Sequence, residues 1–397
     1  MRSRRSMACL LVAAGALAGC SSIAVPSPVA SSPMAGDPTP PPTGDVVTYR
    51  GDAARTGVMP GPGPGPGAAV AWKFQAGGPI ESSPLIIGST VVLASKDGVV
   101  HGIDLATGVQ RWSTTLHAAV ASSSPVFVDG LLVVGDLGGT VHALDPATGA
   151  ERWATSVDGA IDGAAAAIGH FVVTATEGAR AYAIDARTGA IKWTSTLPAA
   201  VTRSVTASTD TVYVGAGGVL LALRLSDGTI RWQSTGSTGS TASSGTPTVA
   251  AGLVFDAIWP DGGSTPGSVV ALDTATGAAR WQYTSPAGRA AYTPAVSDGR
   301  AYIVSEDATV IALDAATGSS IWSTSTGAPN EALPALADGL VYVATDGGEL
   351  VALEAGTGQT TWHVSIVGTP YAPVVAGGFA LVATSTGNLF AIHGSAN

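Results

Sequence analysis

The sequence predicts an all-β fold, an eight-bladed β-propeller built from four-stranded antiparallel blades. Three observations predict it. A phrase that ends in tryptophan recurs about every 40 residues, each period contains short alternating apolar runs, and the two ends of the chain carry complementary parts of one period. A period of this length is typical of propeller blades, helical pairs or solenoid turns. The residues inside one period decide between these architectures.

The apolar runs within a period predict strands. Runs rich in Val, Ala and Tyr, such as residues 301–304 and 340–344, are separated by Asp-Gly or Gly-Gly pairs, which is the pattern of β-hairpins. No window keeps an uninterrupted helical period over ten or more residues, which disfavours helical repeats. Four such strands with three turns need about 40 residues, the length of one propeller blade.

The recurring phrase is clearest at residues 312–322, Ala-Leu-Asp-Ala-Ala-Thr-Gly-Ser-Ser-Ile-Trp. Its Asp can bond the following turn, and its Thr-Gly pair suits a turn with positive φ. Arg224 and Glu354 replace the Asp in two copies, where we expect the corner to turn without the usual Asp bond. Each tryptophan is expected to bury its ring against the neighbouring blade. These blade-docking residues are Trp72, Trp112, Trp153, Trp193, Trp232, Trp281, Trp322 and Trp362.

The phrase Ala-x-Asp-x-x-Thr-Gly-x-x-x-Trp resembles the repeat of the pyrroloquinoline-quinone-like (PQQ-like) propeller family. That family includes BamB-type lipoproteins of outer-membrane β-barrel assembly and quinoprotein dehydrogenases, so the resemblance implies the fold and leaves the function open. In the dehydrogenases the quinone lies between a tryptophan and a disulfide of adjacent cysteines. Ca²⁺ is held there by Glu, Asn and Asp beside a catalytic Asp.

The two ends of the chain are expected to close the ring. Trp72 lies 40 residues before Trp112 without a preceding copy of the phrase, and residues 370–394 supply three strands that stop where the next Thr-Gly turn should begin. We expect the Trp72 strand to be the fourth strand of the C-terminal blade. Such a composite blade leaves no free edge between blades and makes the eighth blade of the ring.

Composition excludes several classes of protein. The 397 residues include 52 Gly, only 12% are charged, and the net charge is −10. A nucleic-acid surface would need the opposite charge. The six histidines are scattered, and the two cysteines, Cys9 and Cys20, both lie at the N-terminus. We therefore expect no metal site, no disulfide and no nucleic-acid partner.

The N-terminus reads as a lipoprotein leader. Residues 1–19 carry Arg2, Arg4 and Arg5, an apolar run, and a Leu-Ala-Gly sequence before Cys20, as in a lipoprotein signal peptide whose cleavage leaves a lipidated cysteine. An ordinary secretory signal with an incidental cysteine is the alternative. Residues 20–47 are rich in Ser and Pro and predict a disordered tether, and residues 48–397 form the propeller. The protein is thus expected to be exported and lipid-anchored to the cell membrane or outer membrane, facing the periplasm or the exterior.

Candidate binding residues come from aligning the blades on the prolines that open their inner strands. The alignment places Glu81, Ser122, Asp162, Thr202, Ser244, Ala291, Glu331 and Pro370 in one ring near the channel mouth, and Arg203, Tyr292 and Tyr371 in the next. These residues differ between blades, whereas structural positions repeat. They are therefore candidates for partner or ligand binding, and solvated rim residues without a task are the alternative.

One blade is longer than the others. The spacing from Trp232 to Trp281 is 49 residues, and the extra residues include Trp259. We expect this insertion in the loop between the second and third strands of its blade, on the face of the channel mouth. Trp259 could anchor a partner there, or it could fold back onto its own blade.

Taken together, these observations favour a non-catalytic, lipid-anchored binding scaffold of the bacterial cell envelope. A BamB-like role is one candidate for such a scaffold. The alternatives are a propeller that senses a carbohydrate or a quinone, and a PQQ-dependent dehydrogenase. The sequence after Cys20 has no cysteine, and its only asparagines are Asn330, Asn388 and Asn397. We name no catalytic residue and no cofactor. The expected partners are the membrane, through the lipid anchor, and an envelope protein, and the chain is expected to be a monomer.

Overall fold

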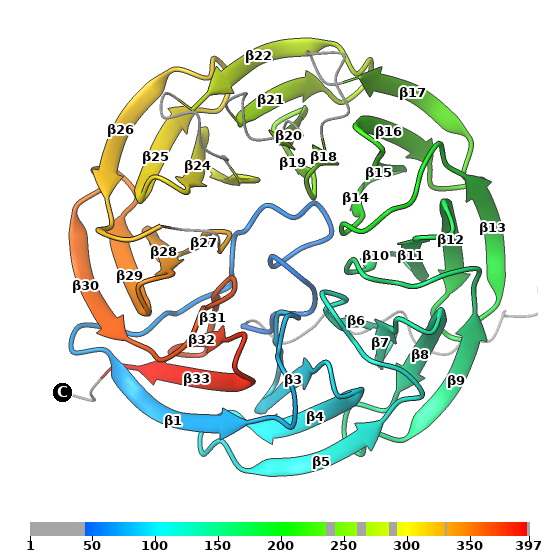
Figure 1. Cartoon of the computed structure of the whole chain (residues 1–397), viewed down its shortest axis with the longest axis horizontal. Helices are drawn as coiled ribbons and strands as arrows, with labels where there is room; N and C mark the ends of the chain where they lie inside the picture. Colours follow the sequence, from blue (N-terminus) through cyan, green and yellow to red (C-terminus); the bar gives the residue numbers. More distant parts are fainter. Residues whose placement is uncertain (1–43, 236–242, 260–266, 286–291, 330–331, 395–397) are drawn as a thin grey trace, which may run out of the picture. The chain divides into compact units, whose positions relative to one another are not determined.

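The computed structural model describes residues 44–235, 243–259, 267–285, 292–329 and 332–394. These residues form eight antiparallel sheets arranged as the blades of a ring, which confirms the predicted eight-bladed propeller (Figure 1). No helix long and apolar enough to cross a membrane occurs in this part of the chain.

Each blade runs outward from a short inner strand to an outer strand that carries the tryptophan. Blades 1 to 4 are β2 (Leu85–Ile87) to β5 (Gln110–Thr115), with β3 (Thr90–Ala94) and β4 (Val99–Asp104); β6 (Val126–Val128), β7 (Leu131–Gly135), β8 (Thr140–Leu144) and β9 (Glu151–Ser156); β10 (Ala166–Ile168), β11 (Phe171–Thr176), β12 (Arg180–Asp185) and β13 (Ile191–Thr196); and β14 (Thr206–Ser208), β15 (Thr211–Ala216), β16 (Val219–Arg224) and β17 (Ile230–Thr235).

The second half repeats this plan with two variations: blade 5 has an additional short strand, β18 (Ser243–Ser244), and blade 8 takes its outer strand, β1 (Ala69–Gln75), from the N-terminal part of the chain. Blades 5 to 8 are β18 (Ser243–Ser244), β19 (Thr248–Ala250), β20 (Leu253–Trp259), β21 (Ser268–Asp273) and β22 (Ala279–Thr284); β23 (Ala295–Ser297), β24 (Arg300–Ser305), β25 (Thr309–Asp314) and β26 (Ser320–Ser325); β27 (Ala335–Ala337), β28 (Leu340–Thr345), β29 (Glu349–Glu354) and β30 (Thr360–Ser365); and β31 (Val374–Ala376), β32 (Phe379–Ala383), β33 (Asn388–His393) and β1 (Ala69–Gln75).

The core lies between blades. The two middle strands of a blade are buried along nearly their whole length, as in β7 and β8, because neighbouring blades cover both sheet faces. Outer strands are more exposed, as in β9, where four of the six residues are exposed and only Trp153 and Thr155 are half-buried. This pattern accounts for the Val- and Ala-rich middle strands and the Ser-, Thr- and Arg-rich outer strands.

The eighth blade is composite, as predicted. The N-terminal strand β1 pairs antiparallel with the C-terminal strand β33, from Ala69 opposite His393 to Gln75 opposite Asn388. In Figure 1 the two strands lie side by side at the lower edge of the ring. The outer strand of the last blade therefore comes from the other end of the chain, and this pairing closes the ring.

Indole rings join successive blades. The Nε1 atom of seven tryptophans donates a hydrogen bond of 2.6–3.1 Å to a backbone carbonyl in the corner of the next blade. The donors are Trp72, Trp112, Trp153, Trp193, Trp232, Trp281 and Trp322, and the acceptors are Leu105, Pro146, Ala186, Leu225, Thr274, Ala315 and Ala355 in the same order. The glycine of that corner lies against the same ring. At Gly318, an added Cβ atom would lie 2.7 Å from Cδ2 of Trp281.

The joint made by Trp362 differs. Blade 8 has no Thr-Gly corner to accept its Nε1, and no such hydrogen bond occurs for Trp362 among the described residues. Its ring lies 5.7 Å from that of Tyr342 and packs on the hydrophobic cluster of blades 7, 8 and 1. Within the described part of the chain, apolar packing in this cluster takes the place of the indole hydrogen bond.

The Asp of the phrase caps the corner as expected. In blade 2, Oδ1 of Asp145 accepts from the amides of Ala147 and Thr148 and from the Thr148 hydroxyl, and Oδ2 accepts from Arg152 at 2.6 Å. The two variant corners keep the backbone turn. At the corner that begins with Arg224, the carboxylate of Asp227 accepts hydrogen bonds from the amide and the hydroxyl of Thr229. At the other corner, Glu354 accepts from the Thr357 hydroxyl at 2.7 Å.

The fifth blade carries its insertion between its second and third strands, as the spacing predicted. Trp259 is the last residue of β20, where its backbone pairs with Ser243 of the short additional strand β18. The tryptophan therefore lies on a strand and not on the extended loop where it was expected. The rest of the insertion, residues 260–266, and the side chain of Trp259 lie outside the described part of the chain.

A pair of glycines in blade 6 tests the tryptophan joint. Gly318 (φ +73°) touches Trp281, whereas Gly299 (φ +72°) has open space where a Cβ would be. Gly299→Ala should cost about 1 kcal/mol through backbone strain alone. Gly318→Ala should cost about 1–3 kcal/mol more, because the methyl group must displace the indole. Chemical or thermal unfolding of the two variants measures the difference, and equal losses would contradict the joint.

The capped corners should make stability depend on acid pH. The hydrogen bond from Arg152 lowers the pKa of Asp145 from 3.8 to about 2, and Asp104 and Asp273 are held at about 2 by hydrogen bonds from threonine and arginine. A carboxylate whose pKa is lower in the folded state stabilises the fold above its unfolded pKa and loses that effect on protonation. The thermal midpoint should therefore fall as the pH drops from about 4 to about 2. The triple Asp→Asn variant should show a flatter profile in this window, and an unchanged profile would contradict the assignment.

Candidate functional site: the plugged channel mouth

The segment that precedes β1 occupies the centre of the ring. Residues 44–63 cross the middle of the propeller (Figure 1) and bond to the inner part of all eight blades. The contacts are Val46 with Ile86, Val47 with Phe127, Arg55 with Ala165, Ala53 with Ala207, Ala54 with Val249, Thr56 with Val296, Gly57 with Leu336, and Gly61 and Pro62 with Gly377 and Gly378. We call residues 44–63 the plug.

Arg55 fixes the plug to blades 3 and 4. Its side chain is completely buried. The guanidinium donates to the carbonyls of Ala165 at 2.5 Å and Val205 at 3.1 Å, and to the hydroxyl of Thr48 and the carbonyl of Tyr49 at 2.7 Å. Burial lowers the pKa of Arg55 to about 10, so the group remains charged at neutral pH. Carbonyl oxygens replace water around this charge.

Arg50 makes a second buried attachment. Its Nη2 donates to the carbonyl of Pro294 in blade 6 at 2.6 Å, and its Nε donates to the carbonyl of Arg55 at 3.0 Å. Burial also lowers the pKa of this guanidinium. The two arginines tie the plug to blades 3, 4 and 6 and to each other.

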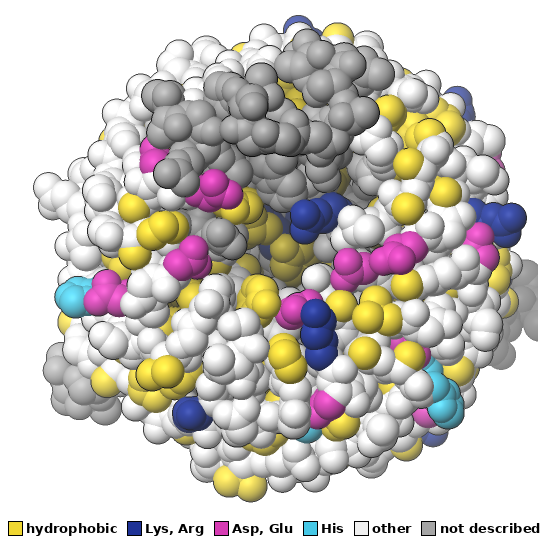
Figure 2. All heavy atoms as spheres, in the orientation of Figure 1, with side chains coloured by type: hydrophobic (Ala, Val, Ile, Leu, Met, Phe, Trp, Pro, Cys, Tyr) yellow, Lys and Arg dark blue, Asp and Glu magenta, His cyan; other side chains and the backbone are white. Residues whose placement is uncertain are grey.

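A cavity of about 580 Å³ lies above the plug at the channel mouth. All eight blades line it, and Tyr49 of the plug belongs to its lining. The centre of the Tyr49 ring lies 5.4 Å from the guanidinium carbon of the buried Arg55, a contact that helps to fix the ring. Figure 2 shows this face hollowed at its centre, with side chains of both charges around the hollow. The cavity is therefore a pocket with a fixed floor.

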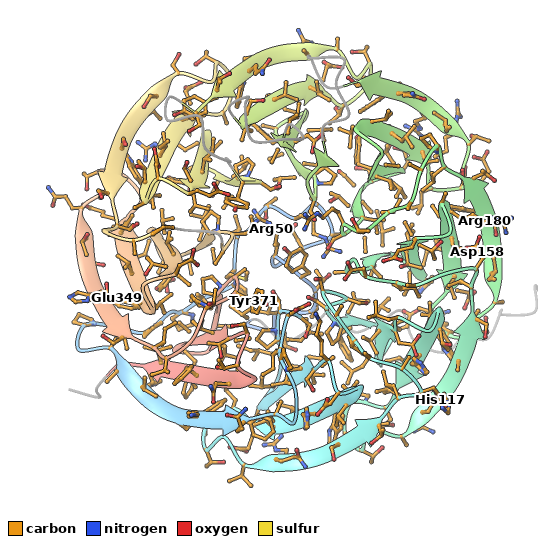
Figure 3. The ribbon with its side chains drawn as sticks, in the orientation of Figure 1. Arg50, His117, Asp158, Arg180, Glu349 and Tyr371 are labelled. Atoms are coloured by element: carbon orange, nitrogen blue, oxygen red, sulfur yellow. The ribbon has the colours of Figure 1, made fainter. Side chains whose placement is uncertain are left out.

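Blades 1 and 8 form one wall of the pocket. Glu81 pairs with Lys96 at 2.6 Å, and Tyr371 lines the cavity beside them. Burial, with a smaller contribution from the charge of Glu81, raises the pKa of Tyr371. Figure 3 places Tyr371 near the ring axis, whereas His117, Asp158, Arg180 and Glu349 lie towards the periphery.

Blade 6 forms another wall. The hydroxyl of Tyr292 donates to Glu306 at 3.1 Å, and both side chains line the cavity. Burial and then the charge of Glu306 raise the pKa of Asp346 in the next blade. Tyr292 and Glu306 are thus held by one another at the mouth.

The pocket collects much of the ring predicted from the alignment. Glu81, Ser122, Thr202, Arg203, Pro370, Tyr292 and Tyr371 line it. Asp162 does not line it; its carboxylate accepts from the amide of Ser122 at 3.3 Å and so links blades 2 and 3. Ala291, Glu331 and the lipidation candidate Cys20 lie outside the described residues, as does the side chain of Ser244.

The sequence did not predict the plug. The tether was expected to end at residue 47, yet Val46 is already fully buried and pairs with Ile86 of blade 1. Residues 49–57 were expected only to precede the first strand. The available signal was two arginines within a Gly- and Ala-rich stretch of a chain that has few charges.

Comparison with known proteins is consistent with this architecture. The family described as outer membrane protein assembly factor BamB matches the chain at residues 66–165, 96–259, 139–293 and 265–396. The chain belongs to the BamB family. No curated protein matches the sequence.

Solved structures similar to this BamB-family chain include proteins of different kinds. BamB from Moraxella catarrhalis is 18% identical with a TM-score of 0.67, over 83% of this chain and 98% of that one. The designed protein Ika8 is 17% identical with a TM-score of 0.71, over 80% and 97%. Quinohemoprotein alcohol dehydrogenase from Comamonas testosteroni is 17% identical with a TM-score of 0.69, over 89% and 81%. At these identities the likeness shows the fold alone.

The pocket residues do not fit the quinone and calcium set of the dehydrogenases in the PQQ-like family. Both cysteines precede residue 44, so none lies among the described residues. Nowhere in those residues do three His, Cys, Asp or Glu side chains converge as metal ligands. Asn388, the one asparagine described, bonds Thr386 within blade 8. We therefore derive no step through a quinone.

The buried arginine of the plug should contribute strongly to stability. Arg55→Lys should lower the free energy of unfolding by about 3 kcal/mol or more, because a single ammonium cannot satisfy carbonyls on both blades 3 and 4. Arg180→Lys is the matched control, since Arg180 is half-exposed and pairs with Asp158 at the surface; it should cost less than about 1 kcal/mol. Denaturant unfolding compares the two, and similar losses would show that the plug contributes little.

Proposed function

We propose that this BamB-family chain is a non-catalytic binding scaffold, exported and lipid-anchored at Cys20, that recognises an envelope partner with the face around the channel mouth. One observation carries the proposal. Side chains that differ from blade to blade gather around a pocket on this face, whereas the opposite face presents the repeated Thr-Gly corners. Side chains that break a structural repeat are the better candidates for recognition.

The BamB relationship supports an envelope role. The matching family is described as an outer membrane protein assembly factor. The leader and Cys20 support export and anchoring. Within the described residues, the pocket's carboxylates are already engaged, Glu81 by Lys96 and Glu306 by Tyr292. This arrangement favours binding over acid-base chemistry.

Cross-linking in intact envelopes tests the proposal. Tyr371→Ala and Arg203→Ala, at two residues that line the pocket, should each reduce the yield of a specific cross-linked partner several-fold and leave the melting temperature unchanged. Val109→Ser is the control, because Val109 is 64% exposed in a Thr-Gly corner of the opposite face, and it should leave the yield unchanged. Equal yields from all variants would contradict the assignment of the recognition face.

Two further measurements test the anchor and the enzyme alternative. Cys20→Ala should move the protein from the membrane fraction to the soluble fraction, because the acyl chains supply the membrane affinity.

Adding PQQ and Ca²⁺ to the purified protein should give no bound-cofactor absorption and no dye reduction with alcohols. A cofactor spectrum with turnover would replace the scaffold by the dehydrogenase alternative.

A further inference from the structure

Three tyrosines line the pocket at the channel mouth, together with many hydroxyl-bearing residues. Tyr49 comes from the plug, Tyr292 from blade 6 and Tyr371 from blade 8. The lining also includes Ser and Thr side chains from most blades, which are Ser83, Ser122, Thr202, Ser204, Thr246, Thr293 and Thr369. A tyrosine presents an apolar ring together with a polar hydroxyl. The cavity can therefore contact a ligand that has both apolar faces and many hydroxyl groups.

Charge in the described lining is balanced. Its charged side chains are Glu81, Glu306 and Arg203, and Lys96 neutralises Glu81 at the rim. A strongly anionic ligand would need more cations than these residues supply, and a strongly cationic ligand would meet Arg203. The pocket therefore suits a ligand without net charge.

The two carboxylates are also held in place. Lys96 binds Oε1 of Glu81, and the Tyr292 hydroxyl binds Oε1 of Glu306. Each carboxylate has a further oxygen that can accept hydrogen bonds. Fixed carboxylate acceptors form strong hydrogen bonds with hydroxyl donors. The carboxylates of Glu81 and Glu306 could therefore accept hydrogen bonds from ligand hydroxyls on two walls of the pocket.

We propose that the channel mouth binds a neutral saccharide. A sugar ring has C–H faces that pack on aromatic rings and a rim of hydroxyls that bond carboxylates, serines and threonines. The cavity of about 580 Å³ lies within the usual range of small-molecule sites, about 300–1,000 Å³. The inference rests on the proposed function, because it assigns a ligand class to the same recognition face. It covers a free saccharide and the glycan of an envelope polymer or glycoprotein, which share this chemistry.

Calorimetry and saturation-transfer NMR with the full propeller test the inference. The probes are maltose, cellobiose, trehalose and chitobiose, with glucuronate and glucosamine as charged comparisons. At least one neutral disaccharide should bind more tightly than both charged sugars. Tyr371→Ala should weaken that binding about tenfold, because the aromatic face is lost, whereas Tyr371→Phe should retain it within about threefold. Glu306→Gln should weaken binding, and the peripheral Glu349→Gln, which pairs with His363, should not.

The outcomes separate this inference from the proposed function. The inference is overturned if no neutral sugar binds at millimolar concentration, if a charged sugar binds best, or if Tyr371→Ala leaves binding unchanged. If mouth variants still abolish partner cross-linking in that case, the scaffold function stands. If a disaccharide binds and mouth variants leave cross-linking intact, the saccharide site stands and the protein-recognition face is wrong. Long oligomers binding much more tightly than disaccharides would indicate a polymer glycan as the source.

Discussion

The indole joint between blades is the interaction on which the ring depends. A four-stranded sheet cannot bury both faces alone, so each blade needs a neighbour on either side. The tryptophan supplies apolar area and a directed hydrogen bond at once: Trp281 covers the corner glycine Gly318 and donates to the carbonyl of Ala315. The Thr-Gly turn of one blade and the Trp of the previous blade therefore form one functional unit. This coupling explains why both recur with the same period although they meet across blades.

The plug imposes a second constraint, because it makes the two ends of the channel different. Arg55 carries a positive charge into a buried position, where backbone carbonyls of blades 3 and 4 surround it. Those carbonyls belong to the residues that immediately precede the inner strands β10 and β14, and the plug supplies hydrogen-bond donors for them. Tyr49 of the plug lines the pocket at the channel mouth, so the plug forms part of the pocket wall.

Sequence reasoning predicted the ring and most of the mouth, but it could not predict the plug. Blade number and the pairing of the Trp72 strand followed from a local, repeated pattern that needs no long-range information. Alignment of the blades placed Glu81, Tyr292 and Tyr371 near the axis because equivalent positions share a radius. The plug has no repeat and no strand period, and its bonds reach residues 150 or more positions away, such as Val205 and Pro294. A Gly- and Ala-rich segment carries no pattern that specifies such partners.

The repeated residues hold the blades together, whereas the residues that differ between blades lie at the channel mouth, where a ligand could bind. Positions that must fit a neighbouring blade repeat because seven of the eight joints share one geometry, so they cannot vary to suit a ligand. The mouth residues carry no such requirement, and all eight blades converge on them. An aromatic floor held by a buried guanidinium loses little side-chain freedom when a ligand binds, because Tyr49 is already ordered by Arg55. The plug thus contributes to recognition in two ways: it blocks the channel, and it presents a rigid surface at the base of the one region where the blades differ.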